Sequence, residues 1–300
     1  MTSAGPLPEA LLRGLCDDAA IFPPGNLALE LAVPAHLEHL GAPHAPLVGP
    51  FIVAAGRLTE LAGLLEGQPA GSFGVALTVP TLEALAPALG AADAIPAVRV
   101  EGVEVALDAD TAPDAVVPLL DAALASHPDV TVFVEVPRDA RRPDLVAALS
   151  GTPYLAKFRT GGVRADLYPD EAELAEAVVT TARAGVPFKA TAGLHHAVRN
   201  TDPVTGFEQH GFVNLIAAVD AALDGADVEE VQRLLAERDG TVLAAFLHDA
   251  LDEDAATRLR QQFRSFGTCS IAEPVEELAD LGLLDPALVP APTTLEGPTR

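Results

Sequence analysis

Short apolar segments alternate with amphipathic stretches between residues 50 and 191, and this alternation constrains the fold more than any other feature of the sequence. It favours a parallel sheet, because a chain that has formed one strand needs a helical crossover to start the next strand in the same direction. The apolar segments predict strands at 50–55, 73–79, 96–100, 130–136, 154–159 and 187–191, and the stretches between them predict helices at 58–65, 81–89, 113–126, 142–149 and 170–184.

After residue 210 the pattern becomes mainly helical, which makes the end of the sheet less regular. Helices are expected at 212–223, 228–236, 255–263 and from Pro274 onward, with a seventh strand at 241–247 and a short eighth strand at 268–272. We therefore expect an α/β fold, a (β/α)8 TIM-like barrel that is irregular in its last two units. An open doubly wound parallel sheet is the alternative.

No linker divides the chain, and its 300 residues suit one barrel of about 250 residues with extensions. We expect a single barrel domain over 1–288, which includes an N-terminal extension (1–48). A flexible C-terminal tail is expected over 289–300, because that segment is rich in Pro and Thr.

The formal net charge of -25 limits the classes of partner. A negative field repels phosphate backbones and anionic lipid surfaces, so neither nucleic acid nor a membrane is an expected partner. The first residues lack the basic start and apolar run of a signal peptide, and we expect a cytoplasmic protein. Cys16 and Cys269 are too few for a disulfide framework and are expected to be packed side chains.

Lysine is rare in this chain: only Lys157 and Lys189 among the 18 basic residues are lysines. The abundance of Ala, Gly, Pro and Arg indicates a GC-rich bacterial genome that replaces lysine by arginine wherever any cation will serve. Lysines that survive such a bias are expected where a compact, titratable amine is required.

Side-chain parity directs several charged residues toward the barrel axis, because successive residues of a strand point to opposite faces. Phe158 and Phe188 are expected to face the helices, which turns the lysine beside each of them inward. The residues predicted to face the axis are Arg99, Glu135, Lys157, Arg159, Lys189 and Thr191. Their excess of positive charge indicates a site for a small anionic substrate, whereas a buried network of ion pairs around Glu135 is the alternative.

The segment after the Lys189 strand adds further candidates. His195, His196 and Arg199 follow the strand end, and His210 precedes the helix expected from residue 212. A helix start offers free N–H groups to an anion, and His210 with Asn214 could frame that anion.

The segment Phe188-Lys189-Ala190-Thr191-Ala192-Gly193 resembles the Lys-x-Ser/Thr-x-Gly strand of class I barrel aldolases such as deoxyribose-phosphate aldolase. The resemblance extends over 154–193, and this chain departs from the family because no third lysine follows on a later strand. It implies that Lys189 forms a Schiff base with a sugar phosphate or keto acid, in an aldolase or lyase without a cofactor.

That chemistry would assign each candidate a role. A lysine that attacks a carbonyl must be neutral, so its pKa has to be lowered by burial and by nearby cations, which Lys157 and Arg159 would supply. Glu135 or His195 would move the proton next to the iminium. The substrate-binding candidates are Arg159, Arg199, Arg99, Thr191, His210 and Asn214.

Two other classes of function remain open from the sequence. A metal-dependent barrel lyase, isomerase or hydrolase would hold a divalent ion on Glu135, His195, His196 and His210, although no standard metal spacing is present. Asp17 and Asp18 would then fold over the barrel mouth as ligands, or else simply cap a turn. The third class is a non-catalytic small-molecule-binding protein on a degenerate barrel. A homo-oligomer is compatible with each class.

Overall fold

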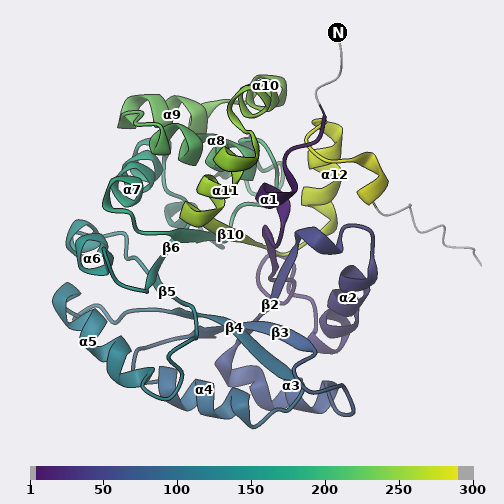
Figure 1. Ribbon diagram of the computed structural model, residues 1–300, viewed down its shortest axis with the longest axis vertical. Coiled ribbons are helices and arrows are strands. Elements are labelled where there is room, and N and C mark those ends of the chain that lie inside the picture. Colours follow the sequence, from purple (N-terminus) through teal and green to yellow (C-terminus); the bar gives the residue numbers. More distant parts are fainter. Residues whose placement is uncertain (1–4, 290–300) are drawn as a thin grey trace, which may run out of the picture.

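Eight parallel strands close into a barrel in the computed structural model, which describes residues 5–289 (Figure 1). Their order around the barrel follows their order in the chain, and β1 pairs with both β2 and β10 to close it. The strands are β1 (Cys16–Asp18), β2 (Val48–Ala54), β3 (Phe73–Val79), β4 (Val98–Val105), β5 (Val132–Glu135), β6 (Leu155–Arg159), β7 (Phe188–Thr191) and β10 (Phe263–Thr268). The predicted (β/α)8 barrel is confirmed, and closure excludes the open sheet.

Helices surround the barrel and connect its strands (Figure 1). They are α1 (Glu9–Leu12), α2 (Leu29–Gly41), α3 (Leu58–Leu64), α4 (Leu85–Asp93), α5 (Pro113–Ala123), α6 (Arg142–Leu149), α7 (Glu171–Ala184), α8 (Phe212–Leu223), α9 (Val228–Ala236), α10 (Gly240–Ala250), α11 (Glu253–Gln262) and α12 (Ala272–Asp280). A small antiparallel ribbon joins β8 (Asn200–Thr201) to β9 (Glu208–Gln209). No helix in the described part of the chain is long and apolar enough to cross a bilayer.

Local sequence explains where the helices begin and end. In α7 the side chain of Asp170 accepts a hydrogen bond from the Glu173 backbone N–H at the first turn. Gly185 follows the last turn with a φ of 63°, a left-handed conformation that glycine adopts without strain. The cap and the glycine fix α7 between β6 and β7, and the predicted helix over 170–184 is confirmed.

Two strand predictions in the C-terminal part of the chain are wrong, and one strand near the N-terminus is not predicted from the sequence. The segment 241–247 lies in α10, where Leu243, Ala244 and Leu247 form one buried helical face. The last strand is β10, and most of 268–272 leads into α12 instead. The first strand lies inside the segment expected to be an N-terminal extension. β1 has only three residues, two of them acidic, so its pairing partners rather than an apolar run make it a strand. Most of the predicted tail, residues 290–300, lies outside the described residues.

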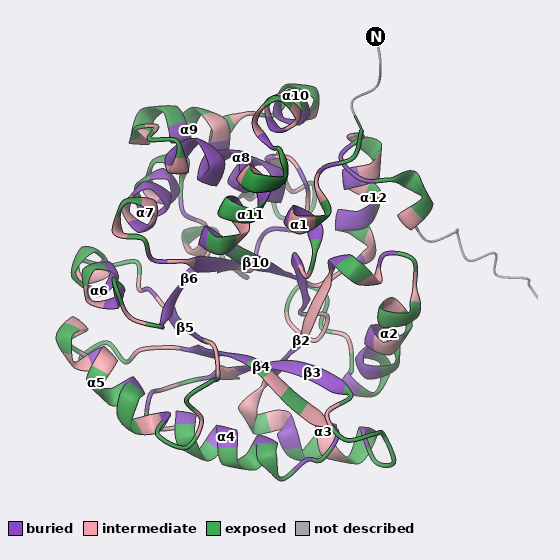
Figure 2. Ribbon diagram, in the orientation of Figure 1, coloured by how far each residue is buried: buried purple, intermediate pink, exposed green. Residues whose placement is uncertain are grey.

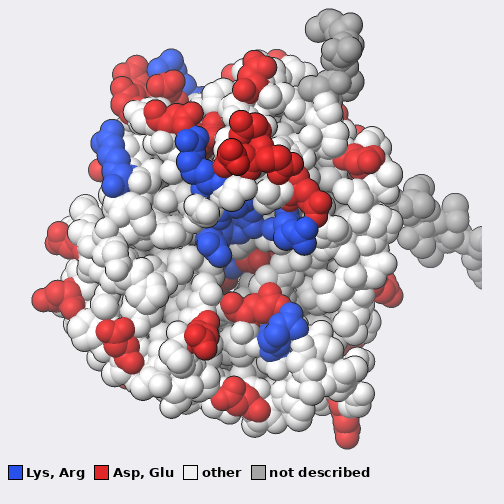
Figure 3. Space-filling model, in the orientation of Figure 1, with Lys and Arg blue, Asp and Glu red and all other residues white. Residues whose placement is uncertain are grey.

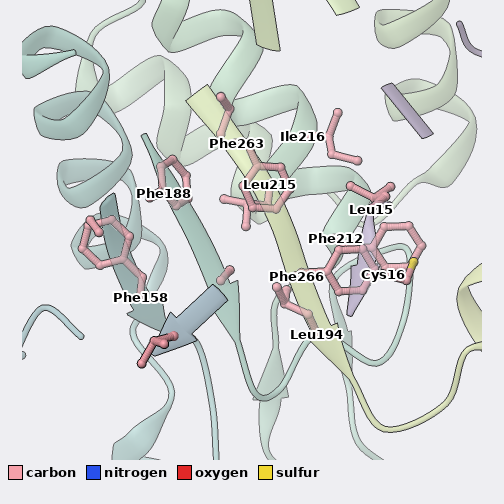
Figure 4. Packing of buried hydrophobic residues seen from close by; sticks show 14 of the residues in the cluster. Leu15, Cys16, Phe158, Phe188, Leu194, Phe212, Leu215, Ile216, Phe263 and Phe266 are labelled. Carbon is pink, nitrogen blue, oxygen red and sulfur yellow. The ribbon is translucent and has the colours of Figure 1, made fainter. Parts of the chain in front are cut away.

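The main core lies between the outer face of the barrel and the helices (Figure 2). Phe158 of β6, Phe188 of β7 and Phe263 of β10 lie in a row, with ring centroids 5.3 Å apart at each step (Figure 4). Phe212 of α8 stacks on Phe266 of β10 at 4.7 Å. Burying each phenylalanine contributes about 1.5–3 kcal/mol. Because Phe158 and Phe188 pack on the outer face of the barrel, the residues next to them on the same strands, Lys157 and Lys189, face the interior, as predicted.

Candidate active site

Alternating acidic and basic side chains form a continuous series of ion pairs through the barrel interior, which we call the charge series. Lys189 binds Asp17 and also Glu104, the latter with 2.5 Å between Nζ and Oε1. The amine of Lys157 lies 2.8 Å from Glu104 Oε2 and 2.9 Å from Glu135 Oε2. The series is Asp17–Lys189–Glu104–Lys157–Glu135–Arg159, and its last step joins Glu135 Oε1 to Arg159 Nε at 3.6 Å.

Strand register places three members of the series side by side. Glu135 of β5 pairs with Lys157 of β6, and Lys157 pairs with Lys189 of β7. Residues at paired positions of neighbouring strands point to the same face of the sheet. The two rare amines therefore both face the barrel interior, as the parity argument predicts.

The carboxylates keep both amines positively charged. Burial by itself favours the neutral form of Lys189, but Asp17 and Glu104 outweigh it and raise the pKa of the amine. The pKa of Lys157 is raised in the same way, by Glu104 and Glu135 against the effect of burial. Burial alone would raise the pKa of Glu104, but the two ammonium groups lower it to about 2. Neither lysine is a free amine in this arrangement.

The predicted excess of positive charge in the barrel is wrong. Arg99 lies near the start of β4, is largely exposed, pairs with Glu101 and donates to the carbonyl of Gly71, so it does not belong to the interior. Asp17 and Glu104, which were not predicted to face the axis, join the charge series and give it three cations and three carboxylates. The charge series therefore contains as many acidic as basic side chains.

A pocket of about 580 Å³ opens at the carboxyl end of the strands, the end at which barrel enzymes carry their active sites. Glu104, Glu135 and Lys157 line it together with Arg159 and Thr191. Its apolar lining includes Phe22, Pro23, Ile52, Val79 and Val163. Of the two lysines, only Lys157 lines this pocket; Lys189, 1% exposed, lines a different cavity at the opposite end of the barrel. We call the 580 Å³ pocket the C-terminal pocket.

The turn after β7 brings His195 to the C-terminal pocket. Ala192 and Gly193 both have positive φ values, 65° and 75°. A Cβ on Gly193 would lie 2.8 Å from the Thr160 carbonyl oxygen, so this close approach of two loops requires glycine. Burial, assisted by His196, lowers the pKa of His195 below its usual value of 6.5. His195 is therefore neutral at neutral pH and able to accept a proton.

Cys269 also lines the C-terminal pocket, with its Sγ 3.4 Å from His195 Nδ1. Burial raises the pKa of this thiol, so it is protonated at neutral pH. A protonated thiol is a poor nucleophile, and the pair supplies polarity to the pocket wall rather than a nucleophile.

Three predicted substrate-binding residues have structural roles instead. The buried guanidinium of Arg199 lies 2.7 Å from Glu171 and 3.2 Å from Glu208. His210 contacts the Pro169 carbonyl oxygen through Nε2 at 2.8 Å. Asn214 accepts from the Arg199 backbone N–H and donates to two carbonyl oxygens at the C-terminal end of α9, those of Leu234 and Glu237. These partners use the groups that were expected to bind an anion, and none of the three lines the C-terminal pocket.

The residues proposed as metal ligands do not gather in one place. His196 lies 2.6 Å from Glu277, and His210 is buried against Arg199. Asp18 binds His36 at 2.9 Å, and Asp17 lies inside the barrel rather than over its mouth. Residues 5–289 contain no group of three or more His, Cys, Asp or Glu side chains arranged to hold a metal ion.

Sequence reasoning missed Glu104 because it ended the strand at residue 100, whereas β4 continues to Val105. The signal was present, since Val103 and Val105 flank Glu104 with strict alternation. Asp17 carried no such signal, because β1 is recognisable only from its partners.

No family model matches the chain, and no curated protein matches it. Three of the matching solved structures are the following. Dihydrodipicolinate synthase of Thermotoga maritima shares 13% identity over 91% of this chain and 100% of its own, with a TM-score of 0.38. Dihydrodipicolinate synthase of Oceanobacillus iheyensis shares 14% sequence identity over 93% of this chain and 91% of its own, with a TM-score of 0.37. The carboxyl transferase domain of Rhizobium etli pyruvate carboxylase shares 11% identity over 82% of this chain and 50% of its own, with a TM-score of 0.39.

Proposed function

We propose that this protein is an aldolase-type lyase that acts on a small carbonyl compound bearing an anionic group. One observation carries the proposal: the C-terminal pocket is lined by the Lys157 amine between two carboxylates and, on the same strand, by Arg159. The amine would meet the substrate carbonyl and the guanidinium would bind the anionic group. A pocket of about 580 Å³ suits a small molecule.

Arg159 is suited to recognise the anionic group. Its side chain is 41% exposed, and its only carboxylate contact among the described residues is Glu135 at 3.6 Å. The guanidinium thus keeps donors free for a carboxylate or phosphate, which it binds through paired hydrogen bonds. This supports the anionic substrate class expected from the sequence, with Arg159 as the partner and without Arg99 or Arg199.

The balance of charge favours a non-covalent role for Lys157. In the cleavage direction, neutral His195 would take the proton of a hydroxyl group on the β carbon. The bond between the α and β carbons then breaks, the β carbon becomes a new carbonyl, and the released electron pair forms an enolate. The Lys157 ammonium would stabilise the enolate oxygen by a charge-assisted hydrogen bond. Protonated His195 returns its proton to the α carbon, which completes the reaction.

The predicted Schiff base on Lys189 fits this geometry poorly, since Lys189 is held as an ammonium ion and lies outside the C-terminal pocket. A Schiff base on Lys157 would first require transfer of a proton from the amine to Glu135. Trapping with borohydride separates these routes, because it reduces an imine to a stable adduct and leaves an ammonium ion unchanged.

The test combines turnover with trapping. The full-length protein is incubated with β-hydroxy keto acids and phosphorylated ketoses, and carbonyl products are followed by NMR. We expect turnover that Lys157→Met and Arg159→Gln abolish or greatly reduce, while Arg183→Gln, which removes an exposed arginine of α7, leaves it unchanged. Borohydride is expected to leave the protein mass unaltered. An adduct on Lys157 would replace the non-covalent step by a Schiff base, whereas turnover that survives Lys157→Met would overturn the proposal.

A further inference from the structure

A second cavity, of about 420 Å³, opens at the opposite end of the barrel and is lined by residues at or before the strand starts, such as Gly14, Pro50, Thr131 and Arg264. We call it the N-terminal cavity. Figure 3 shows Lys and Arg side chains gathered at the centre of one face, in the hollow beside α1 and α11. The basic residues that line the cavity are Arg13, Lys189, Arg260 and Arg264. In a chain with a net charge of -25 this gathering of cations is unusual.

Arg260 is held in place by main-chain oxygens rather than by an acid. Its guanidinium donates to the carbonyls of Phe263 at 2.8 Å and Arg13 at 2.9 Å. No carboxylate among the described residues lies within 4.0 Å of it. Burial lowers the pKa of Arg260 to about 10, and the charge of Asp17, which is not in contact, offsets only part of this effect. The side chain remains charged at neutral pH and is fixed in one position, which is the preorganisation that an anion site requires.

Arg264 follows on β10, where it is exposed and lines the same cavity. Within residues 5–289 its side chain forms no ion pair. The other charges around the cavity are matched locally: Lys189 by Asp17, Arg13 by Glu9 and Glu101 by Arg99. Two positive charges, those of Arg260 and Arg264, are left without a carboxylate partner among residues 5–289.

We propose that the N-terminal cavity is a binding site for a compact dianion, such as a phosphate or a small dicarboxylate, held by Arg260 and Arg264. Arg264 forms no ion pair within residues 5–289, so its guanidinium can bind the anion through paired hydrogen bonds. The Nη atoms of Arg260 donate to four carbonyl oxygens, so this side chain contributes its fixed positive charge and its remaining N–H. Thr257 and Gln261 of α11 add polar side chains to the lining. The site differs from the C-terminal pocket, which is lined by Arg159 and Lys157.

The charge series connects the two sites through the barrel. Asp17 and Lys189 line the N-terminal cavity, while Glu104, Glu135, Lys157 and Arg159 line the C-terminal pocket. A dianion in the N-terminal cavity would therefore lie next to one end of the series, while the proposed substrate lies at the other end. This position suits an effector rather than a second substrate.

The test is calorimetric titration of the full chain with inorganic phosphate and, separately, with malonate, at low ionic strength. The Arg159→Gln variant serves as the background, because it removes the anion-binding arginine of the C-terminal pocket. We expect one site to remain in this background. Adding Arg264→Gln should weaken that site about tenfold or more, since a charge-assisted hydrogen bond is lost. Arg183→Gln, the same charge change on α7, should alter the affinity less than about twofold.

Arg264 is exposed, so its replacement is expected to leave the fold intact, and circular dichroism checks this. Charge reversal by Arg264→Glu should abolish binding of both probes. Tighter binding of phosphate or of malonate would each support the site and identify the class of ligand. Loss of all binding in Arg159→Gln alone, or unchanged affinity in Arg264→Glu, would overturn the proposal. Absence of lyase turnover would overturn only the proposed function, because this titration does not depend on it.

Discussion

Lys157 and Lys189 occupy paired positions on β6 and β7, and one carboxylate, Glu104, binds both amines. Two ammonium groups at paired positions repel each other, and the interior of the barrel offers little water to screen them. Glu104 reaches both from β4, one carboxylate oxygen for each amine. The two lysines of the sequence are thus tolerated side by side because a strand across the barrel supplies the opposite charge.

We predict that Glu104→Gln costs about 3–5 kcal/mol of unfolding free energy, because it leaves two buried ammonium groups without their shared partner. Urea denaturation at neutral pH measures this loss. The pKa of Glu104 is lowered from 4.5 to about 2 in the folded protein, so its contribution is present above pH 4.5 and disappears as the pH falls toward 2. Glu101→Gln at the exposed pair with Arg99 is the control and should cost less than about 1 kcal/mol. Equal losses for the two variants would contradict the role of Glu104.

Asp220→Asn is predicted to stabilise the protein at neutral pH. Burial, assisted by Asp224, raises the pKa of Asp220 to about 6, and its Oδ1 has no hydrogen-bond partner among the described residues. The folded state binds the proton more tightly than the unfolded state, so this carboxyl group lowers stability as pH rises from 3.8 to about 6. We expect a gain of about 1 kcal/mol at neutral pH that vanishes near pH 4. Thermal unfolding at the two pH values checks it, and a gain that persists in acid would contradict it.

Replacement of Arg199 is predicted to lower stability, whereas replacement of Arg159 is predicted to weaken substrate binding. Arg199→Gln should cost about 3 kcal/mol of stability, because it leaves Glu171 without its buried partner and loosens the loop after β7. Arg159→Gln, at a side chain 41% exposed, should cost less than about 1 kcal/mol while it weakens binding of an anionic substrate. Chemical denaturation and ligand titration of both variants give the comparison. If Arg159→Gln proved the more destabilising of the two, the assignment of roles would be wrong.

The pH dependence of turnover is predicted to report on His195. Because the proposed step needs the neutral imidazole, kcat/KM should fall on the acid side, with an apparent pKa below the usual 6.5 of histidine. His195→Gln should lower kcat/KM and remove this acid limb, while His196→Gln, at a residue paired with Glu277, should keep it. An acid limb that survives in His195→Gln would assign the proton transfer to another group.

Much of the barrel was predictable because its signals are local. Apolar runs of strand length identify six strands, and the parity of Phe158 and Phe188 correctly turns Lys157 and Lys189 inward. Glu135 follows from the same rule. The apolar segment 241–247 shows the limit of such reasoning, since an apolar run of that length suits a buried helix face as well as a strand.

Residue spacing alone could not separate binding residues from structural ones. His195, Arg199 and His210 lie close together in the sequence, yet only His195 lines the C-terminal pocket. Arg199 and His210 turn away because Glu171 and the Pro169 carbonyl, which precede β7 in the chain, provide their partners. Arg99 points inward by parity but lies at the wrong end of its strand.

The sequence by itself determined the order of the strands from β2 to β7 with the helices between them, and the inward direction of the two lysines, because these depend on neighbours in the chain. The tertiary structure alone decided that both lysines are charged. Asp17 and Glu104 come from strands far away in sequence, and only closure of the barrel brings their carboxylates to the amines. The protonation state of a buried amine depends on such distant partners, so the chemistry of this site was fixed by the closed fold.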